Sequence, residues 1–424
     1  MTTPTVLGPV STLARYPLAG EFNLDFTRSL PEGFVITRDT AGCYIDPAGY
    51  PRIAAPNVPM FEKDGLLLDG ANTNYLPNSE HDSGTVGFRW WAGSDRASIA
   101  STYKFGDLTM ARFQENAGSF SPYLSGTYNL PSSVPLVVGA PICISGFLKL
   151  PPDANGNRYI WLQLSVAFAD GGTGDWRIAF RGTGSSTTSG IAAADATITQ
   201  VTTPLADGIV RSGVVITPAR AGVINSARFV YNSDVSVNTR SLDGSGAIDA
   251  GGWQISNGLM TCYIRTGNTP TTRAMDSVSG PVSNMLNPVD QSGTVFADYD
   301  LDGFAPSWTS PFRFTSAAGT NRFYISVSTG NTSKWQIAAP VNFNPSGGTV
   351  VFPGVVKTAL KVNPADIRAV TNGSTNSGSA GTGSPVAPEV FVLQAPDYRR
   401  FRFRQIRSTH EILTGTPITL PTVV

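Results

Sequence analysis

The sequence predicts an all-β protein built of β-sandwiches, and three observations support this fold class. Charged residues make up only 14% of the 424 residues, against about 25% in typical globular proteins, so long charged helices are scarce. Glycine (44) and proline (31) are abundant and supply turns. Between the turns lie many short stretches rich in β-branched and aromatic residues, a spacing that is typical of sandwiches.

The length allows two or three domains, and we divide the chain into three regions. Residues 1–80 are predicted to form an N-terminal arm, through Ala19-Gly20, and a connector. Residues 81–284 are predicted to form a middle sandwich, and residues 285–424 a C-terminal sandwich. The predicted strands include 158–168, 176–181 and 227–231, and further along 294–303, 321–328, 334–339, 357–362 and 399–406. The Gly- and Ser-rich segments 182–190 and 372–388 are predicted to be mobile loops.

Charge and cysteine usage exclude several classes of protein. The net charge is zero, which gives no electrostatic basis for binding nucleic acid or an anionic membrane. The three cysteines (Cys43, Cys143, Cys262) are far apart and form no CxxC pair, so they are expected to be buried free thiols. No signal peptide or membrane-spanning segment is visible, and we expect synthesis in a cytoplasm without export.

The segment from Leu24 to Leu76 contains four short motifs. These are DFTR at 25–28, YxDxxG at 44–49, AAxNxPxF at 54–61 and GLLLxGxxTN at 65–74. Together they resemble an opening found in many tail and appendage proteins of tailed bacteriophages.

A second block, Gly251 to Asp276, is similar to a further pattern of the same class, WGxQxExGxxxTxYIxTxxxxxTRxxD. The matching positions are Gly252, Gln254, Gly258, Thr261, Tyr263, Ile264, Thr266, Thr272, Arg273 and Asp276. Three departures occur. Gly251 stands where the class has Trp, Ser256 stands where it has Glu, and the spacing from Gly258 to Thr261 is one residue short. The C-terminal segments GTVFADY, KTALKVN, VTNG and FRFRQIR resemble a concanavalin A-like lectin sandwich.

These resemblances imply a jelly-roll-like middle sandwich and a concanavalin A-like C-terminal sandwich. They imply a virion structural protein, a tail fibre or spike-type appendage assembled in the host cytoplasm, that contributes to host attachment by contacting surface glycans. The expected partners are other virion proteins, bound through the N-terminal arm, and further copies in a homotrimer or another homo-oligomer. Two alternatives are a purely structural head decoration, collar or baseplate subunit, and a depolymerase of surface polysaccharide.

Enzymatic chemistry is not expected. The two histidines, His81 and His410, lie outside any nucleophile motif, so a Ser-His-Asp triad is disfavoured. A glycosidase needs paired carboxylates, and no ExDxxE strand is present. No cofactor is expected.

One acidic strand gives a weak calcium candidate. Asp298, Asp300 and Asp302 match the first half of a calcium-binding loop, but Thr309 stands where the loop needs Glu. Period-two alternation places the three aspartates on one face of the strand and Val295, Ala297, Tyr299 and Leu301 on the other. A solvated strand face is therefore the preferred interpretation.

Outward aromatic residues are the candidates for carbohydrate binding, because the C–H faces of sugars pack on aromatic rings. In a strand containing Phe88-Arg89-Trp90-Trp91, Arg89 and Trp91 point away from the core. Trp308, in the segment after the acidic strand, is a second candidate. For each Trp, burial against a neighbouring domain or subunit is the preferred interpretation, and sugar stacking ranks second.

The strand YRRFRFRQIR alternates phenylalanine with arginine. Phe401 and Phe403 are expected in the core, and Arg400, Arg402 and Arg404 form a ladder on the opposite face. Adjacent like charges repel, so the ladder needs an anionic counterpart. The first-ranked counterpart is the Asp298–Asp302 face or a neighbouring subunit. An anionic polysaccharide and simple solvation are the alternatives.

Overall fold

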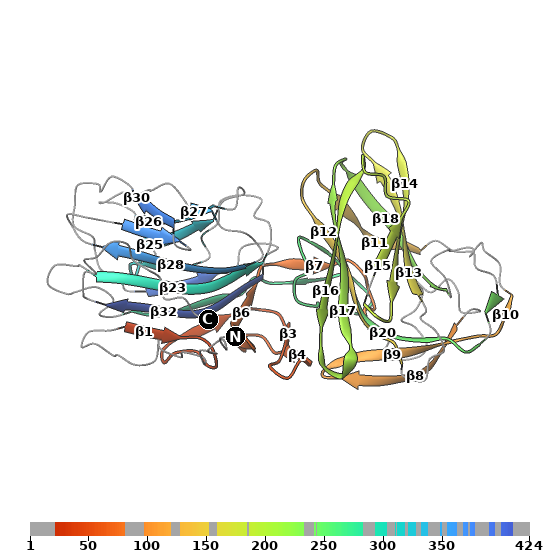
Figure 1. Cartoon of the computed structure of the whole chain (residues 1–424), viewed down its shortest axis with the longest axis horizontal. Coiled ribbons are helices and arrows are strands. Elements are labelled where there is room, and N and C mark those ends of the chain that lie inside the picture. The colour runs from red at the N-terminus through yellow and green to blue at the C-terminus, as the bar shows by residue number, and fades with distance from the viewer. Residues whose placement is uncertain are drawn as a thin grey trace, which may run out of the picture.

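A computed structural model describes 22–80, 97–119, 128–151, 159–184, 186–232, 241–242, 244–282, 293–302, 310, 312–318, 321–327, 332–337, 348–349, 354–362, 368–371, 374–377, 390–394 and 400–409. In these ranges the regular structure consists of β-strands and one short 3₁₀ turn, Ala206–Gly208. The predicted all-β class is therefore confirmed, and the strands form two sandwiches that lie side by side (Figure 1).

The middle sandwich has jelly-roll order. One sheet runs β16 (Ala196–Pro204), β17 (Val210–Pro218), β12 (Ile142–Lys149), β20 (Ala247–Asn257), β9 (Leu108–Glu115) and β8 (Ala97–Phe105). The other sheet runs β11 (Tyr128–Leu136), β18 (Gly222–Asn232), β13 (Tyr159–Phe168), β14 (Thr173–Arg181) and β15 (Ser186–Ser189). The chain repeatedly crosses from one sheet to the other, as a jelly roll requires.

Alternation along β13 shows how the sequence builds this sandwich. Ile160, Leu162 and Leu164 are at most 1% exposed and face the opposite sheet. The intervening Gln163 and Ser165 are half-buried or exposed on the outer face. Each buried aliphatic side chain stabilises the fold by roughly 1.5–3 kcal/mol, which fixes the strand's orientation.

The second sandwich, which we call the C-terminal sandwich, contains strands from both ends of the described chain. One sheet runs β30 (Ser374–Ser377), β29 (Arg368–Thr371), β28 (Gly354–Val362), β23 (Gly293–Asp302), β32 (Arg400–Thr409), β6 (Gly65–Asp69) and β5 (Met60–Glu62), and β1 (Phe22–Asp25) also pairs with β32. The facing sheet runs β2 (Val35–Thr37), β22 (Ser277–Pro281), β31 (Val390–Gln394), β24 (Phe312–Thr315), β25 (Asn321–Val327), β26 (Thr332–Ile337) and β27 (Gly348–Thr349). Its core is rich in aromatic rings: Phe391 and Phe403 contact each other, and each also contacts Phe26 and Phe312.

This pairing differs from the division at residue 80. The segment predicted to be a connector supplies β1, β2, β5 and β6 to the sandwich that we placed at 285–424. The physical reason is that strands of three to five residues cannot bury an apolar face alone and pair with longer strands. Along the chain, the middle sandwich is consequently inserted between two parts of the C-terminal sandwich. Residues 1–20 of the predicted arm lie outside the described part of the chain.

Two of the predicted loops contain strands. β15 lies inside 182–190 and pairs with β14, and β30 lies inside 372–388 and pairs with β29. Their Ser and Thr residues occur at sheet edges, where pairing with one neighbour suffices and composition is a poor guide.

Candidate functional site

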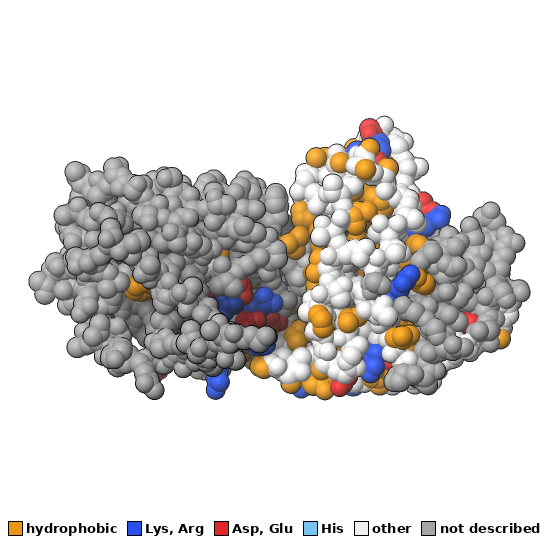
Figure 2. All heavy atoms as spheres, in the orientation of Figure 1, with side chains coloured by type: hydrophobic (Ala, Val, Ile, Leu, Met, Phe, Trp, Pro, Cys, Tyr) orange, Lys and Arg blue, Asp and Glu red, His pale blue; other side chains and the backbone are white. Residues whose placement is uncertain are grey.

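The two sequence blocks, 24–76 and 251–276, meet at the junction of the two sandwiches. Within them, β7 (Asn72–Asn74) pairs antiparallel with β21 (Thr271–Arg273). The chain leaves the C-terminal sandwich through β7 and returns to it through β21 (Figure 1). Figure 2 shows basic and acidic side chains gathered on the surface where the two sandwiches meet. We define the junction as residues 38–80 together with 251–276.

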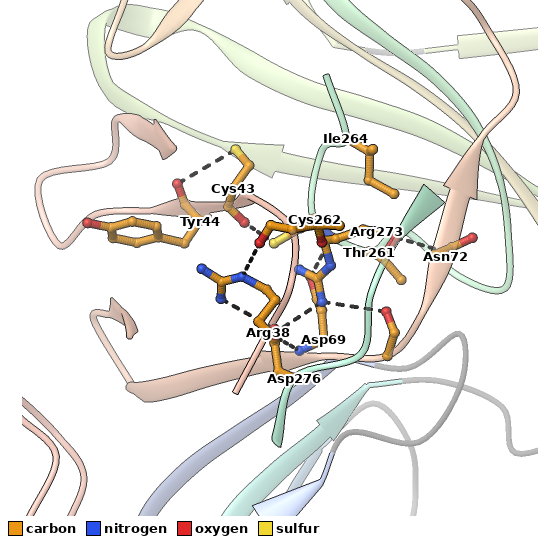
Figure 3. A network of polar contacts seen from close by, with 12 residues as sticks. Arg38, Cys43, Tyr44, Asp69, Asn72, Thr261, Cys262, Ile264, Arg273 and Asp276 are labelled. Carbon is orange, nitrogen blue, oxygen red and sulfur yellow. Dashed lines mark hydrogen bonds and ion pairs between the residues drawn. The ribbon is translucent and has the colours of Figure 1, made fainter. Parts of the chain in front are cut away.

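Four buried charged side chains form the centre of the junction (Figure 3). Arg273 binds Asp69 at 3.1 Å and Asp276 at 3.2 Å. Arg38 binds the other oxygen of Asp276 at 3.3 Å. All four side chains are at most 2% exposed, so the network contains two positive and two negative charges away from water.

Backbone groups extend this network, although Asp69 Oδ1 is buried without a hydrogen-bond partner. The Asp69 N–H donates to Asp276 Oδ2 at 2.7 Å, and the Cys262 N–H donates to Asp69 Oδ2 at 3.0 Å. Arg38 donates through Nη2 to the carbonyl oxygens of Ala55 and Val58. These bonds fix the positions of three segments, because a buried charge without such partners would cost several kcal/mol.

The electrostatics indicate a structural network. Burial raises the pKa of Asp276, although Arg273 and Arg38 oppose that shift. Burial acts to lower the pKa of Arg273, but Asp69 and Asp276 outweigh it and raise that pKa. Every guanidinium is occupied by carboxylates or carbonyls, and the side chains have no access to water. Such a site orients segments and offers no acid or base to a substrate.

Two asparagines connect β7 to the middle sandwich. Asn74 donates to the carbonyl oxygens of Trp253 and Ile264 and accepts from the N–H groups of Leu76 and Ile255. Asn72 donates to the Asn257 carbonyl and the Thr261 hydroxyl. All hydrogen-bonding capacity of the Asn74 amide is thereby used, and its side chain is fully buried.

Further polar contacts extend the junction into the middle sandwich. Glu80 accepts two hydrogen bonds of 2.8 Å from Arg265 and a third from the Thr109 N–H. The Ile53 N–H donates to Asp107 at 2.8 Å, and the Asp107 N–H donates to the Pro51 carbonyl. Asp107 belongs to the turn between β8 and β9, so these bonds join β4 (Pro51–Ala54) directly to the middle sandwich.

The departures from the pattern of the second block lie in this same region. Gln254 accepts from the Ile264 N–H and donates to Ser256, the residue that stands in place of Glu. Trp253 packs against Phe180 and Phe229 in the middle core. A small polar Ser256 therefore fits a position that is 1% exposed, where an unpaired Glu would be costly.

The three cysteines are buried free thiols in the structure, as expected from the sequence. The Cys262 thiol contacts the Cys43 carbonyl oxygen, again joining the two blocks (Figure 3). Burial raises the pKa of the Cys143 thiol to about 12, which keeps it protonated at neutral pH.

The carbohydrate-binding candidates Trp91, Arg89 and Trp308 lie outside the described residues, as do His81 and His410. Within the described part, the exposed large hydrophobic side chains are all aliphatic: Val35, Val58, Ile99, Val137 and Val138. No aromatic side chain belongs to this exposed set, and the partly buried aromatic side chains of the described part include Tyr50 and Tyr103.

The arginine ladder has carboxylate partners inside the chain. Arg404 binds Asp298 at 3.0 Å and Asp300 at 2.5 Å, and Arg402 binds Glu62 at 2.7 Å. β23 and β32 are neighbours, and a register shift opposite Asp298 and Tyr299 lets Arg404 reach both aspartates. Arg404 thus has the intramolecular partners that we ranked first. The side chains of Arg400 and Asp302 lie outside those described.

These ion pairs bear on the calcium candidate. Two of its three carboxylates, Asp298 and Asp300, already bind one guanidinium. No group of three metal-ligating side chains occurs among the described residues.

In the same part of the chain, no helix has the length and hydrophobicity needed to span a bilayer.

Comparison with known proteins adds little to this picture. No family model matches the sequence, and no curated protein matches it. Among solved structures, mouse laminin alpha1 chain, domains LG4-5, is similar over 69% of this chain and 88% of that chain, at 9% identity and a TM-score of 0.23. A likeness this weak carries no argument about function.

The sequence analysis did not identify Arg38, Asp69 or Asn74 as site residues. Asp69 and Asn74 lie inside the GLLLxGxxTN motif of the first block, Arg38 lies between two motifs of that block, and Arg273 and Asp276 close the second block. The sequence gives no local signal that these two blocks, which are about two hundred positions apart, contact each other.

Proposed function

We propose that this chain is a structural protein of a tailed-bacteriophage particle, in a tail fibre or spike-type appendage that contributes to host attachment. The observation that carries the proposal is the convergence of the two phage-like sequence blocks in one buried junction. Residues that hold an architecture together are expected to form such a buried contact, whereas catalytic residues would line an accessible cleft.

The distribution of polar groups supports the same proposal. The four buried charged side chains at the centre of the junction bind one another, and Arg404 binds Asp298 and Asp300 across the strand pair β23–β32. The proposed role is therefore mechanical support and non-covalent binding. Glycan contact, with Trp91 and Trp308 as the candidate residues, would gain strength from many copies on one particle.

Particle purification tests the structural part of the proposal. Particles released from cells that carry the gene are banded on a density gradient and probed with antiserum against the purified chain. We expect the chain to band with the particles in several copies each, and immunogold to mark one position. A host cytoplasmic enzyme serves as the contamination control. If the chain remains with that enzyme, it is not a virion component.

A separate assay addresses attachment. Purified chain is added to host cells before the particles, and adsorption is measured with and without enzymatic removal of surface glycans. We expect competition that depends on the glycans. If the chain bands with particles but neither binds cells nor competes, the purely structural alternative replaces the attachment role.

A further inference from the structure

The edge strand β16 lacks the usual protection of sheet edges. An edge strand presents unpaired N–H and C=O groups, and proteins normally shield them with short length, charge, proline or bulges. β16 forms one edge of the six-stranded sheet of the middle sandwich, and among the described strands only β17 pairs with it.

The other described edges of the two sandwiches are protected. β8 has a register shift between Ile99 and Ser101 and carries Lys104. β11 has a register shift and contains Pro131 and Pro135. The remaining edge strands of the two sandwiches, β1, β2, β5, β15, β27 and β30, are only two to four residues long.

β16 differs from all of these edges. It is nine residues long, its sequence ATITQVTTP contains no charge, and its only proline is the last residue. Its register with β17 is continuous from Ala196 to Pro204. Most of its side chains are exposed, including Thr199 and Gln200. Figure 2 shows mainly uncharged atoms over the face formed by β16 and β17.

We propose that β16 pairs antiparallel with β16 of a second copy of this chain, so that the two six-stranded sheets form one continuous sheet. With the two-fold axis at Gln200, the middle residue, Thr199 lies opposite Val201 of the other copy, and Thr197 lies opposite Thr203. Cross-strand pairs of β-branched residues are favourable, and no like charges oppose each other.

The backbone supports this register. The Leu205 N–H donates to the Ile209 carbonyl, just beyond the β16–β17 pair. Because antiparallel ladders alternate, the N–H groups of Ile198, Gln200 and Thr202 then point to the outer edge. The backbone nitrogen of Pro204, which has no hydrogen to donate, also points to the outer edge, so the β16–β17 ladder loses no hydrogen bond.

The strand composition favours a second copy over an unrelated partner. A strand with no charged residue offers no electrostatic means of selecting a different protein, whereas its β-branched residues match those of its own symmetry mate. The inference goes beyond the proposed function, because it concerns the purified chain and holds whether or not that chain belongs to a particle.

Light scattering coupled to size-exclusion chromatography tests the pairing in the full chain. We expect the wild type to shift, as concentration rises, from the 44.8 kDa of one copy to twice that mass. Thr199→Lys with Val201→Lys places like charges opposite each other across the axis and should weaken association at least tenfold. Thr199→Lys with Val201→Glu places opposite charges there and should restore it.

A matched pair of substitutions on the other edge of the same sheet, Ala100→Lys with Thr102→Lys in β8, should leave association unchanged. Circular dichroism and the unfolding temperature verify that each variant is folded. A wild type that stays at 44.8 kDa at all concentrations overturns the proposal. So does an oligomer that is indifferent to both β16 variants.

Discussion

At the scale of single residues, buried charge governs the junction. Arg273 lies between Asp69 and Asp276, and its guanidinium is 2% exposed. A buried pair of this kind adds little net stability compared with apolar packing, but removing one partner leaves buried charge without full compensation. We expect its value to lie in specificity, because another arrangement of these segments would separate the buried charges.

Substitution of Arg273 tests this view. Arg273→Ala should lower the free energy of unfolding by about 3–5 kcal/mol, because two carboxylates lose their shared cation. Urea unfolding measures the change. The control is Arg177→Ala, which breaks a half-exposed pair with Asp175 and should cost no more than about 1 kcal/mol. Equal effects of the two substitutions would contradict the structural role of the network.

The buried thiol of Cys143 predicts sensitivity to alkaline pH. Its pKa is raised from 9.0 to about 12 in the folded chain. Between those values the unfolded chain loses the thiol proton and the folded chain keeps it. The stability is therefore complete below about pH 9 and falls as the pH rises towards 12. Cys143→Ala should make this decline shallower in unfolding measurements at several pH values, and an unchanged slope would refute the assignment.

Thiol accessibility gives a further check at this scale. All three cysteines are buried, so a thiol-reactive dye should label none of them in the native chain at pH 8. The same dye should label all three after denaturation, because the sequence has three cysteines and the structure has no disulfide. Rapid labelling of one native thiol would contradict the described burial.

At the scale of elements, short strands acquire their roles from distant partners. β7 has only three residues, yet the side chains of Asn72 and Asn74 bind several positions of the second block between Trp253 and Ile264. Side-chain amides supply these bonds because the backbone of a three-residue strand pairs with one neighbour only. The junction therefore depends on two side chains more than on the strand itself.

Asn74→Asp isolates that dependence. The substitution keeps the shape but removes both amide donors, so the Trp253 and Ile264 carbonyls lose their partner. We expect a loss of roughly 2–6 kcal/mol in the free energy of unfolding, since each orphaned buried group costs about 1–3 kcal/mol. Thr73→Val, at the neighbouring exposed position, is the matched control and should change stability little. A neutral Asn74→Asp would show that the amide does not hold the junction.

The sequence predicted regular strands well and their distant partners poorly. The alternation in β13, β23 and β32 is a local signal, so the core side of Leu162, Tyr299 and Phe403 could be read directly. The placement of β1 and β6 beside β32 is a long-range pairing without a local signature. The same holds for Arg273, whose two partners come from different segments. The pairing of Arg404 could be proposed because aspartates occupy alternate positions of one strand and arginines occupy alternate positions of another.

At the scale of the whole molecule, the two sandwiches share the junction. Asn74, Glu80 and Asp107 each bond across it. Two bodies joined by several buried bonds should unfold together, whereas bodies joined by a loose linker unfold separately. The insertion of the middle sandwich into the C-terminal sandwich strengthens this expectation, because the chain passes between the two through the paired strands β7 and β21.

Calorimetry tests the coupling. We expect one unfolding transition for the wild type. Asp107→Ala removes the acceptor for the Ile53 N–H and a partner of Arg52, and it should separate the unfolding into two overlapping transitions. Asp175→Ala, within one sheet of the middle sandwich, should retain a single transition. Two resolved transitions in the wild type would mean that the sandwiches are independent.

The pairing of Phe22 with Ser408 determines how the chain responds to mechanical load. A pull applied at these two residues acts at one end of the antiparallel β1–β32 pair and opens its hydrogen bonds one after another, as a zipper opens. The force path stays inside the sandwich that contains both ends of the described chain. The inserted sandwich lies off that path, so it would remain folded and free of tension while the terminal strands peel apart.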